Sequence, residues 1–409
     1  MKRTQIVIVG AGPTGLEAAL AASEAGLDFT VFEADTAPGG NVRAWGHVGL
    51  FTPWSMNASP RARARLSAGG MPAPDGDACP TGHELVDHVL GPLAALPDIA
   101  PNIHYGTRVL QIGRDGYLKS DEIGTGRRAE RPFRLLVEDA RGERVVFADV
   151  VLDCSGTYHN PNALGTGGIL APGERSVADR ITRLIPDVDG EPNAWAGKRI
   201  LLVGAGHSGQ TAACSLATLA ERHSSTAVTW AIRGEDRSFG ALEDDGLPVR
   251  AELASSAAEI ATQPASGVRV LWGSSVDALR DTDDGIEVTL RAAEAPDADP
   301  ETIEVDEIIA LTGSVGDHAI YRQLQVHECY ATSGPMKLAA ALLADTSADC
   351  LQQESGGADT LRSPEPNFFM LGEKSYGRNT TFLMSVGWQQ VSEVFSTLPT
   401  LATSGAESR

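Results

Sequence analysis

Three glycines near the start of the chain have the spacing of a phosphate-binding turn. The segment Gly10-Ala-Gly12-Pro13-Thr14-Gly15 follows the apolar run 5–9 and precedes the helix-forming run 16–25. A second apolar run, 29–32, ends at Glu33, which lies 23 residues after Gly10. In such a strand–turn–helix–strand unit the glycines allow a tight turn, close approach of a pyrophosphate and helix–strand packing, and the acid accepts from a ribose hydroxyl. The helix N-terminus adds N–H donors. The pattern predicts a dinucleotide site made of Gly10, Gly12, Pro13, Thr14, Gly15 and Glu33.

The same device recurs later with one change. Apolar residues 199–203 precede Gly204-Ala-Gly206-His207-Ser208-Gly209, and a helical stretch runs to about Glu221. The next strand, 227–232, ends at Arg233 rather than at an acid. An arginine there suits the 2′-phosphate of NADPH, whereas an acid suits the free hydroxyl of NADH. Two alternatives stay open: the neighbouring Glu235 and Asp236 could contact a hydroxyl, and Arg233 could be a solvated surface charge. The predicted second site consists of Gly204, Gly206, His207, Ser208, Gly209 and Arg233.

Other elements must position these turns. We expect a small covering sheet from strands near 104–112, 133–138 and 145–152. Thr81 is a plausible cap for a helix over 83–96, with Glu84 as its capping-box partner. Residues 59–80, rich in Pro, Arg, Gly and Ala, are typical of a loop.

Composition excludes several classes of partner. The formal net charge of −21 argues against nonspecific nucleic-acid binding and against an anionic membrane surface. The sequence contains no run of 18 apolar residues, so we expect no membrane-spanning helix. The five cysteines are at least 21 residues apart, which excludes CxxC and CxxxxC motifs and a zinc site built on paired cysteines. Such sparse cysteines favour a reducing, cytoplasmic location.

Further segments resemble a known family. The fingerprints, Gly39-Gly40-Asn41-Val42-Arg43, the turn Leu152–Thr157 and the pair Gly372-Glu373 together resemble the two-dinucleotide-binding flavoproteins, and among these the flavin-containing monooxygenases. The resemblance implies FAD at the first fingerprint and a pyridine nucleotide at the second. It adds Gly40, Asn41, Arg43, Gly156, Gly372 and Glu373 to the FAD contacts. Two features depart from relatives: the dithiol of the disulfide reductases is absent, and so is the FxGxxxHxxx(Y/F) signature of the monooxygenases.

These observations predict an α/β fold with two Rossmann-like, three-layer dinucleotide-binding domains, the NAD(P) domain being inserted in the FAD domain. We expect the FAD domain at 1–165 and 320–395, the NADP domain at 166–319, and a flexible tail at 396–409.

Catalytic candidates follow from the resemblance. In the monooxygenases an Asn in the loop after the paired glycines helps to hold a flavin peroxide, and Asn57 is the matching residue, although a turn-forming role is an equal alternative. His47 is a candidate general acid or a structural residue. Trp45, Phe51 and Trp54 are candidates to line a substrate pocket or stack on the flavin, with core filling as the alternative. Lys374, Tyr376 and Arg378 could pair with a cofactor phosphate or with an acidic substrate, or lie in a solvated loop.

The predicted activity is an FAD- and NADPH-dependent monooxygenase. It would oxygenate a nucleophilic nitrogen or sulfur centre of a small molecule with O2, through a flavin C4a-(hydro)peroxide and without a metal. The alternative is an FAD-dependent NAD(P)H reductase or dehydrogenase that inserts no oxygen. A third possibility is a nucleotide-binding protein without turnover. A homodimer is possible.

Overall fold

The apolar run at residues 5–9 forms the central strand of a parallel sheet. The computed structural model describes residues 4–263, 267–292, 299–344, 349–353 and 355–404. In it β1 (Gln5–Val9) is flanked by β2 (Asp28–Phe32) and β7 (Val150–Asp153), and the order across the sheet is β18-β7-β1-β2-β3. The outer strands are β18 (Phe368–Met370) and β3 (Ile103–His104). All of these strands are parallel.

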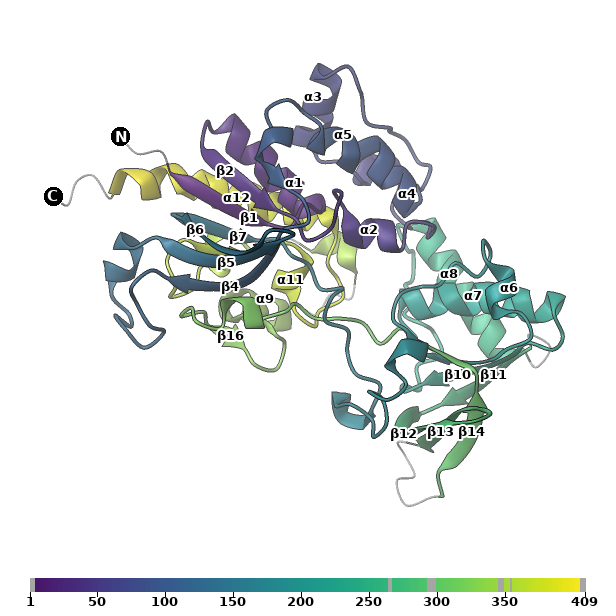
Figure 1. Cartoon of the computed structure of the whole chain (residues 1–409). Helices are drawn as coiled ribbons and strands as arrows, with labels where there is room; N and C mark the ends of the chain where they lie inside the picture. Colours follow the sequence, from purple (N-terminus) through teal and green to yellow (C-terminus); the bar gives the residue numbers. More distant parts are fainter. Residues whose placement is uncertain (1–3, 264–266, 293–298, 345–348, 354, 405–409) are drawn as a thin grey trace. The chain divides into compact units, whose positions relative to one another are not determined.

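Both faces of this sheet are covered, which explains the continuous apolar run. Ile6 and Ile8 pack with the residues of α1 (Pro13–Glu24) and α12 (Met384–Ser404). Val7 and Val9 pack instead against the antiparallel sheet β4-β5-β6. The strands of that sheet are β4 (Arg108–Arg114), β5 (Phe133–Asp139) and β6 (Gly142–Ala148). Figure 1 shows the purple α1 and the yellow α12 side by side next to β1.

Shorter elements complete this unit. Thr81 and Glu84 form the predicted capping box at the start of α4, and the helical path continues as a π-helical turn over Val86–Leu90. The remaining α-helices and strands of this unit are α2 (Gly40–Ala44), α3 (Pro60–Ala68), α4 (Gly82–Leu85), α5 (Gly91–Ala94), β16 (Glu328–Cys329), β17 (Gly334–Pro335), α9 (Met336–Ala344), α10 (Ala358–Leu361) and α11 (Glu373–Tyr376).

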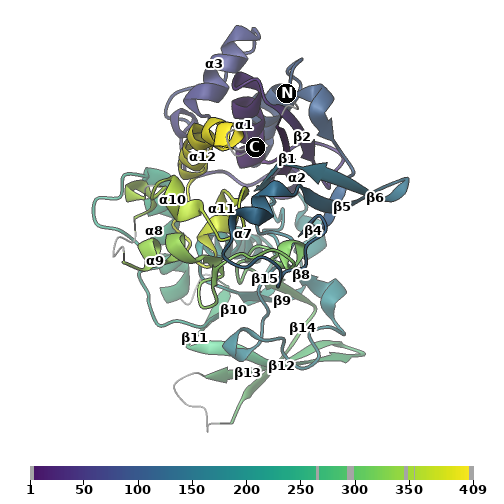
Figure 2. The same cartoon turned by 90° about the vertical axis from the view of Figure 1, so that its left-hand side faces the viewer.

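The second fingerprint begins a unit of the same design. Its sheet has the order β11-β10-β9-β15-β8, with α7 and α8 packed on one face and the antiparallel sheet β12-β13-β14 on the other (Figure 2). The elements are β8 (Ile181–Thr182), α6 (Pro192–Trp195), β9 (Arg199–Val203), α7 (His207–Arg222), β10 (Ala227–Ile232), α8 (Pro248–Thr262), β11 (Val268–Trp272), β12 (Ser274–Thr282), β13 (Gly285–Ala292), β14 (Glu301–Val305) and β15 (Glu307–Ala310).

The chain therefore has the predicted α/β fold with two three-layer, Rossmann-like domains. One unit comprises residues 1–160 and 315–409, and the other, residues 161–314, is inserted between these two segments. Each boundary falls five residues before the expected one. The boundaries lie at an isolated antiparallel β-bridge between Pro161 and Ser314. There the chain leaves the first unit and later returns to it.

Three local expectations differ from the structure. Residues 60–68 are helical because Pro60 starts the helix and the Ser59 side chain accepts from the N–H of Ala62. The run 145–152 divides at Asp149, so its first half joins the covering sheet and its second half joins the parallel sheet. Residues 396–404 belong to α12 rather than to a flexible tail, because Val391, Val394 and Leu398 continue its buried face. Residues 405–409 lie outside the described residues.

Among the described residues, none of the helices has the length and apolar character needed to cross a membrane.

Candidate dinucleotide-binding sites

The first fingerprint forms a turn in which two glycines are required by the protein itself. Gly10 has φ of 97°, and a Cβ on it would lie 2.8 Å from the carbonyl oxygen of Cys154. A Cβ on Gly15 would lie 1.9 Å from the carbonyl oxygen of Gly10. Gly10 thus lets the turn pass the end of β7, and Gly15 lets α1 approach the turn.

Gly12 is different, because internal packing does not require a glycine there. A Cβ at Gly12 would meet no described atom within 4 Å. Gly12 caps α1 with φ of −81° and ψ of −171°, and none of the described side chains hydrogen-bonds to the first turn of the helix. Pro13 occupies the first helical position, and Thr14 and Gly15 follow it. The geometry fits a pyrophosphate held by the N–H groups at the start of the helix.

Glu33 lies beside this turn, at the end of β2. The N–H of Ala11 donates to its Oε2 at 2.6 Å, and the N–H of Asp35 donates to its Oε1 at 2.9 Å. Burial raises the pKa of the Glu33 carboxyl, and these two hydrogen bonds oppose the rise. Because a carboxylate offers about four acceptor positions, Glu33 can still accept from ribose hydroxyls.

The structure brings the other predicted FAD contacts to the same end of the sheet. A Cβ on Gly372 would lie 2.6 Å from Oγ1 of Thr14, so the turn before α11 packs directly on the first fingerprint. A Cβ on Gly156 would lie 3.5 Å from Nδ2 of Asn41. These contacts place residues that are up to 358 positions apart in one region of the first unit.

Two neighbouring turns are joined by side chains. The Thr157 hydroxyl hydrogen-bonds to the Glu373 carboxylate, which itself is exposed to solvent. The surrounding protein nevertheless removes enough water to raise the pKa of Glu373. The segment of α2 also lies close by, because the N–H of Gly39 donates to the carbonyl of Ala11 at 3.0 Å. The Asp35 carboxylate fills the space that a side chain on Gly40 would need.

The contacts of Arg43 indicate a structural role. Its Nε donates to the carbonyl of Pro38 at 3.0 Å, and the side chain is exposed. It therefore braces the loop before α2 from outside, and a cofactor contact by Arg43 stays a prediction.

Asn57 has a complete set of local partners. Its Nδ2 donates to the carbonyls of Thr52 at 2.7 Å and Pro53 at 3.0 Å, and its Oδ1 accepts from the Thr52 hydroxyl at 2.8 Å. Only 2% of the residue is exposed. These bonds favour the turn-forming alternative, because the amide already closes the 52–57 loop. A catalytic role for Asn57 stays a prediction, with no support from its contacts.

In the loop 45–57 some aromatic side chains pack in the core and others lie near the candidate site. His47 is half-buried, and its Nε2 has no hydrogen-bond partner among the described residues. Trp54 belongs to the hydrophobic core of the unit. Trp45 stacks on Tyr158, with ring centroids 6.5 Å apart, and so lies beside the Gly156 turn. A general-acid role for His47 stays a prediction.

The second fingerprint repeats the geometry of the first. A Cβ on Gly204 would lie 2.2 Å from the carbonyl oxygen of Leu311, and one on Gly209 would lie 2.3 Å from the carbonyl oxygen of Gly204. Gly206 again caps its helix, and a Cβ there would meet no described atom within 4 Å. In both units packing explains the first and third glycines, whereas packing does not require a glycine at the second.

His207 and Ser208 begin α7 and are exposed. Loss of water around His207, and then the positive charge of Arg250, lower the pKa of its imidazole below the ordinary 6.5, and Asp245 opposes them. Arg250 and Asp245 form a buried ion pair with an N–O distance of 2.6 Å.

Arg233 follows β10 directly and is exposed, with no ion-pair partner among the described residues. The nearby Arg237 lies over the ring of Trp272, with its guanidinium carbon 5.3 Å from the centroid. The alternative acid Glu235 lies close to Gly273, where a Cβ would be 2.4 Å from its Oε1. Arg233 is thus the unengaged charge at the strand end where a 2′-phosphate would be expected.

Sequence reasoning missed the role of Lys374. This residue is fully buried, so it neither lies in a solvated loop nor reaches a substrate. The only local signal was its place directly after Glu373. Its partner Asp153 is 221 residues away, and no spacing rule connects them.

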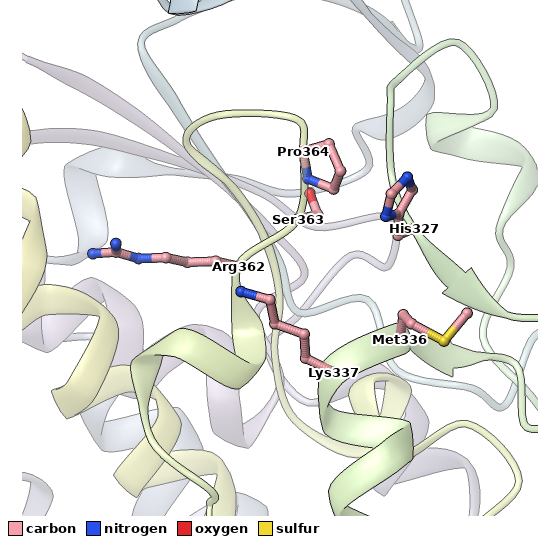
Figure 3. Close-up of a pocket in the computed structure, with 6 residues that line it drawn as sticks. All are labelled: His327, Met336, Lys337, Arg362, Ser363 and Pro364. Atoms are coloured by element: carbon pink, nitrogen blue, oxygen red, sulfur yellow. The ribbon is translucent and has the colours of Figure 1, made fainter. Parts of the chain in front are cut away.

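A separate cavity of about 320 Å³ lies elsewhere in the first unit. Its lining residues include His327, Lys337 and Arg362, and none of the predicted site residues. Figure 3 shows Arg362 extending away from His327, so the basic groups do not converge on one point. This cavity is not part of the dinucleotide sites.

Comparison with known proteins agrees with this architecture. The chain resembles the bacillithiol disulfide reductase of Bacillus cereus, with a TM-score of 0.68, 17% identity, and coverage of 99% of this chain and 100% of the other. It also resembles the flavin-containing monooxygenase of Stenotrophomonas maltophilia, with a TM-score of 0.59, 19% identity, and coverage of 99% and 100%. At these identities the likeness establishes the fold.

One curated relative matches locally. A protein described as a probable N-methylproline demethylase of Rhizobium meliloti (strain 1021) is 56% identical over 41 residues, which are 10% of this chain. The chain spans 6% of the length of that relative.

The family model described as pyridine nucleotide-disulphide oxidoreductase matches residues 4–330, which include both fingerprints and most of both units. The chain therefore belongs to the pyridine nucleotide-disulphide oxidoreductase family, as a flavoprotein with two dinucleotide-binding domains.

Proposed function

We propose that this protein is an NADPH-dependent flavoprotein monooxygenase that acts on a nucleophilic nitrogen or sulfur centre of a small molecule. The observation that carries the proposal is the pair of matched turns. In each, protein packing accounts for the first and third glycines, and open space lies beside the second, Gly12 or Gly206. Two such turns in one chain support two dinucleotides, FAD in the first unit and NADPH in the second.

Each proposed contact has a defined role. The start of α1 would hold the FAD pyrophosphate, Glu33 the adenosine ribose, and Glu373 the ribityl chain. In the second unit the start of α7 would hold the NADPH pyrophosphate, and Arg233 its 2′-phosphate. Bound FAD supplies two-electron redox chemistry and the ability to activate O2. The protein supplies orientation and a site from which water is excluded.

The cysteines favour oxygen chemistry over a dithiol relay. All five are free, and the sequence has no pair with the spacing of a redox dithiol. The pKa of the Cys154 thiol, next to the first fingerprint, is raised by burial, which keeps it protonated and unreactive. Electrons would therefore pass from the flavin directly to a small acceptor. A reductase without oxygen insertion is the second candidate, because fold neighbours include reductases as well as monooxygenases.

Isotope labelling separates these two candidates. The full-length protein, reconstituted with FAD, is given NADPH and a panel of amines and thioethers under ¹⁸O2, and products are analysed by mass spectrometry. A monooxygenase places one ¹⁸O atom in the product, and it forms no oxygenated product when O2 is absent. Anaerobic oxidation of NADPH coupled to the reduction of an added acceptor, such as a disulfide or a quinone, would instead establish the reductase.

Cofactor preference is tested at the strand end. Arg233→Ala should raise KM for NADPH at least about 10-fold, the effect of losing about 1.4 kcal/mol, while KM for NADH stays unchanged. Arg222→Ala, which changes an exposed arginine at the end of α7, is the matched control and should alter neither value. Equal effects of Arg233→Ala on both nucleotides would contradict the role given to Arg233.

A further inference from the structure

Lys374 is a fully buried cation next to the proposed ribityl contact Glu373. Its Nζ donates to Oδ2 of Asp153 at 2.6 Å, to the carbonyl of Asp317 at 2.7 Å and to Oγ of Ser155 at 3.1 Å. Both ionic side chains of the Lys374–Asp153 pair are completely inaccessible to solvent. An ammonium has three N–H groups, so every donor of Lys374 is used.

These partners belong to the turn that follows β7. Asp153 is the last residue of β7, and its Oδ1 accepts from the Ser155 hydroxyl at 2.6 Å and from the Ser155 N–H at 3.2 Å. Lys374, Asp153 and Ser155 therefore form a closed ring of hydrogen bonds. Ser155 precedes Gly156, which has φ of 71°. The ring fixes the point from which the Gly156 turn departs.

A second link joins the same two segments. Beyond the ring, the Thr157 hydroxyl bonds to the Glu373 carboxylate. The Gly156 turn and the start of α11 are thus fastened on both sides of the proposed FAD contacts. Helix α11 has four residues, too few to hold its own orientation in water.

The surroundings are adapted to this lysine. A Cβ on Gly316 would lie 2.4 Å from Cγ of Lys374, so the glycine leaves room for the lysine stem. Its ammonium lies 5.2 Å from the centroid of the Tyr321 ring, which adds a cation–π contact. Burying an ion pair is costly unless all of its hydrogen bonds are satisfied, as they are here. An apolar residue could fill this volume, but it could not tie Ser155 to α11.

We propose that Lys374 is a positioning residue that locks the Gly156 turn to the Gly372-Glu373 turn and thereby orients both for FAD. This inference rests on the proposed function only in taking FAD as the ligand. Lys374 acts through Ser155 and Glu373 and makes no contact with the cofactor. Its loss should weaken FAD binding and change the environment of the bound flavin by more than the loss of stability explains.

The test compares four variants of the full chain. Lys374→Met removes the cation. Asp153→Asn combined with Lys374→Met also removes the buried carboxylate that would otherwise be unpaired. Ser155→Ala opens the ring but keeps the buried ion pair. It therefore tests the ring even if Lys374→Met fails to fold. Glu365→Gln is the control, because Glu365 forms an equally buried network with Arg114 and Arg128 away from the two turns.

Two quantities are measured on each variant: the Kd of the apoprotein for FAD, by flavin fluorescence titration, and the visible circular dichroism of bound flavin at saturation. We expect Lys374→Met to weaken FAD at least about 10-fold and Ser155→Ala about 3-fold, both with altered dichroism. The double variant should recover thermal stability but not affinity. Glu365→Gln should lose stability and keep both the wild-type Kd and the wild-type dichroism.

Two results would overturn the inference. One is wild-type affinity and dichroism in the double variant and in Ser155→Ala. The other is a loss of FAD affinity in Glu365→Gln as large as that in Lys374→Met. A wild-type apoprotein that binds no FAD would overturn the proposed function and this inference with it, so the two failures are distinguishable.

Discussion

Gly12→Ala is expected to separate the requirements of the fold from those of ligand binding. Because the added Cβ would meet no described atom within 4 Å and φ is −81°, alanine fits the backbone without strain. Alanine is a poorer helix cap than glycine by roughly 0.5–1 kcal/mol, and it gains about 0.4–1 kcal/mol by restricting the unfolded chain. The two effects nearly cancel, so the apoprotein should keep its stability within about 1 kcal/mol.

FAD affinity should respond very differently. If the pyrophosphate approaches the backbone at Gly12, the new methyl group occupies its place, and Kd for FAD should rise at least about 10-fold, or 1.4 kcal/mol. Melting temperatures of the apoprotein and fluorescence titration with FAD measure the two effects. Gly206→Ala is the matched control in the second unit, since its Cβ also meets no described atom. It should weaken NADPH and spare FAD.

Gly12→Ala protein that binds FAD with wild-type affinity would refute the placement of the pyrophosphate at Gly12. A large loss of apoprotein stability would refute it too, because the glycine would then be needed by the fold. The same variant with weakened NADPH and normal FAD would mean that the two sites are assigned to the wrong turns.

Other positions give predictions with different readouts. Gly15→Ala should destabilise the first unit by roughly 3 kcal/mol, because its Cβ would lie 1.9 Å from a backbone oxygen; chemical denaturation measures this, and a normal midpoint would contradict the packing. Asn57→Ala should cost about 1–3 kcal/mol of stability by leaving buried carbonyls unpaired, and the reconstituted enzyme should keep its kcat; a fall in kcat at unchanged stability would restore the catalytic interpretation. The lowered pKa of His207 contributes stability that is present above pH 6.5 and is lost as pH falls through the folded-state pKa. The melting temperature of the wild type, relative to that of His207→Asn, should therefore decrease as pH falls below 6.5; a difference that stays constant with pH would contradict this.

Much of the architecture was predictable because the fingerprints are local. The predicted strand 227–232 matches β10 residue for residue, and the helix predicted to end near Glu221 ends at Arg222. Within about 30 residues, strand, turn and helix constrain one another through glycine conformation and periodicity. The capping box at Thr81 and Glu84 was predictable for the same reason. These features need no knowledge of distant segments.

The failures share a different cause. The segment 60–68 starts with four residues of low apolar periodicity. In the structure it forms α3, which packs Ala62 and Leu66 into the core. The Asp98 carboxylate binds both Ser23 and Arg65 and so holds α3 in place. For Asn57 the sequence left a catalytic and a turn-forming role open, and its bonds to Thr52 and Pro53, which favour the second, depend on the path of the loop. Tertiary packing can override local propensity in such segments.

The sequence by itself determined two glycine turns that each begin a helix, the sheets that carry them and the charge at each strand end. The tertiary structure decided which distant segments meet around these turns. The pairing of Lys374 with Asp153 spans 221 residues, and it exists because β18 and β7 lie side by side in one sheet. A turn is set by the dihedral angles of a few consecutive residues, whereas a buried ion pair is set by how separate strands come together.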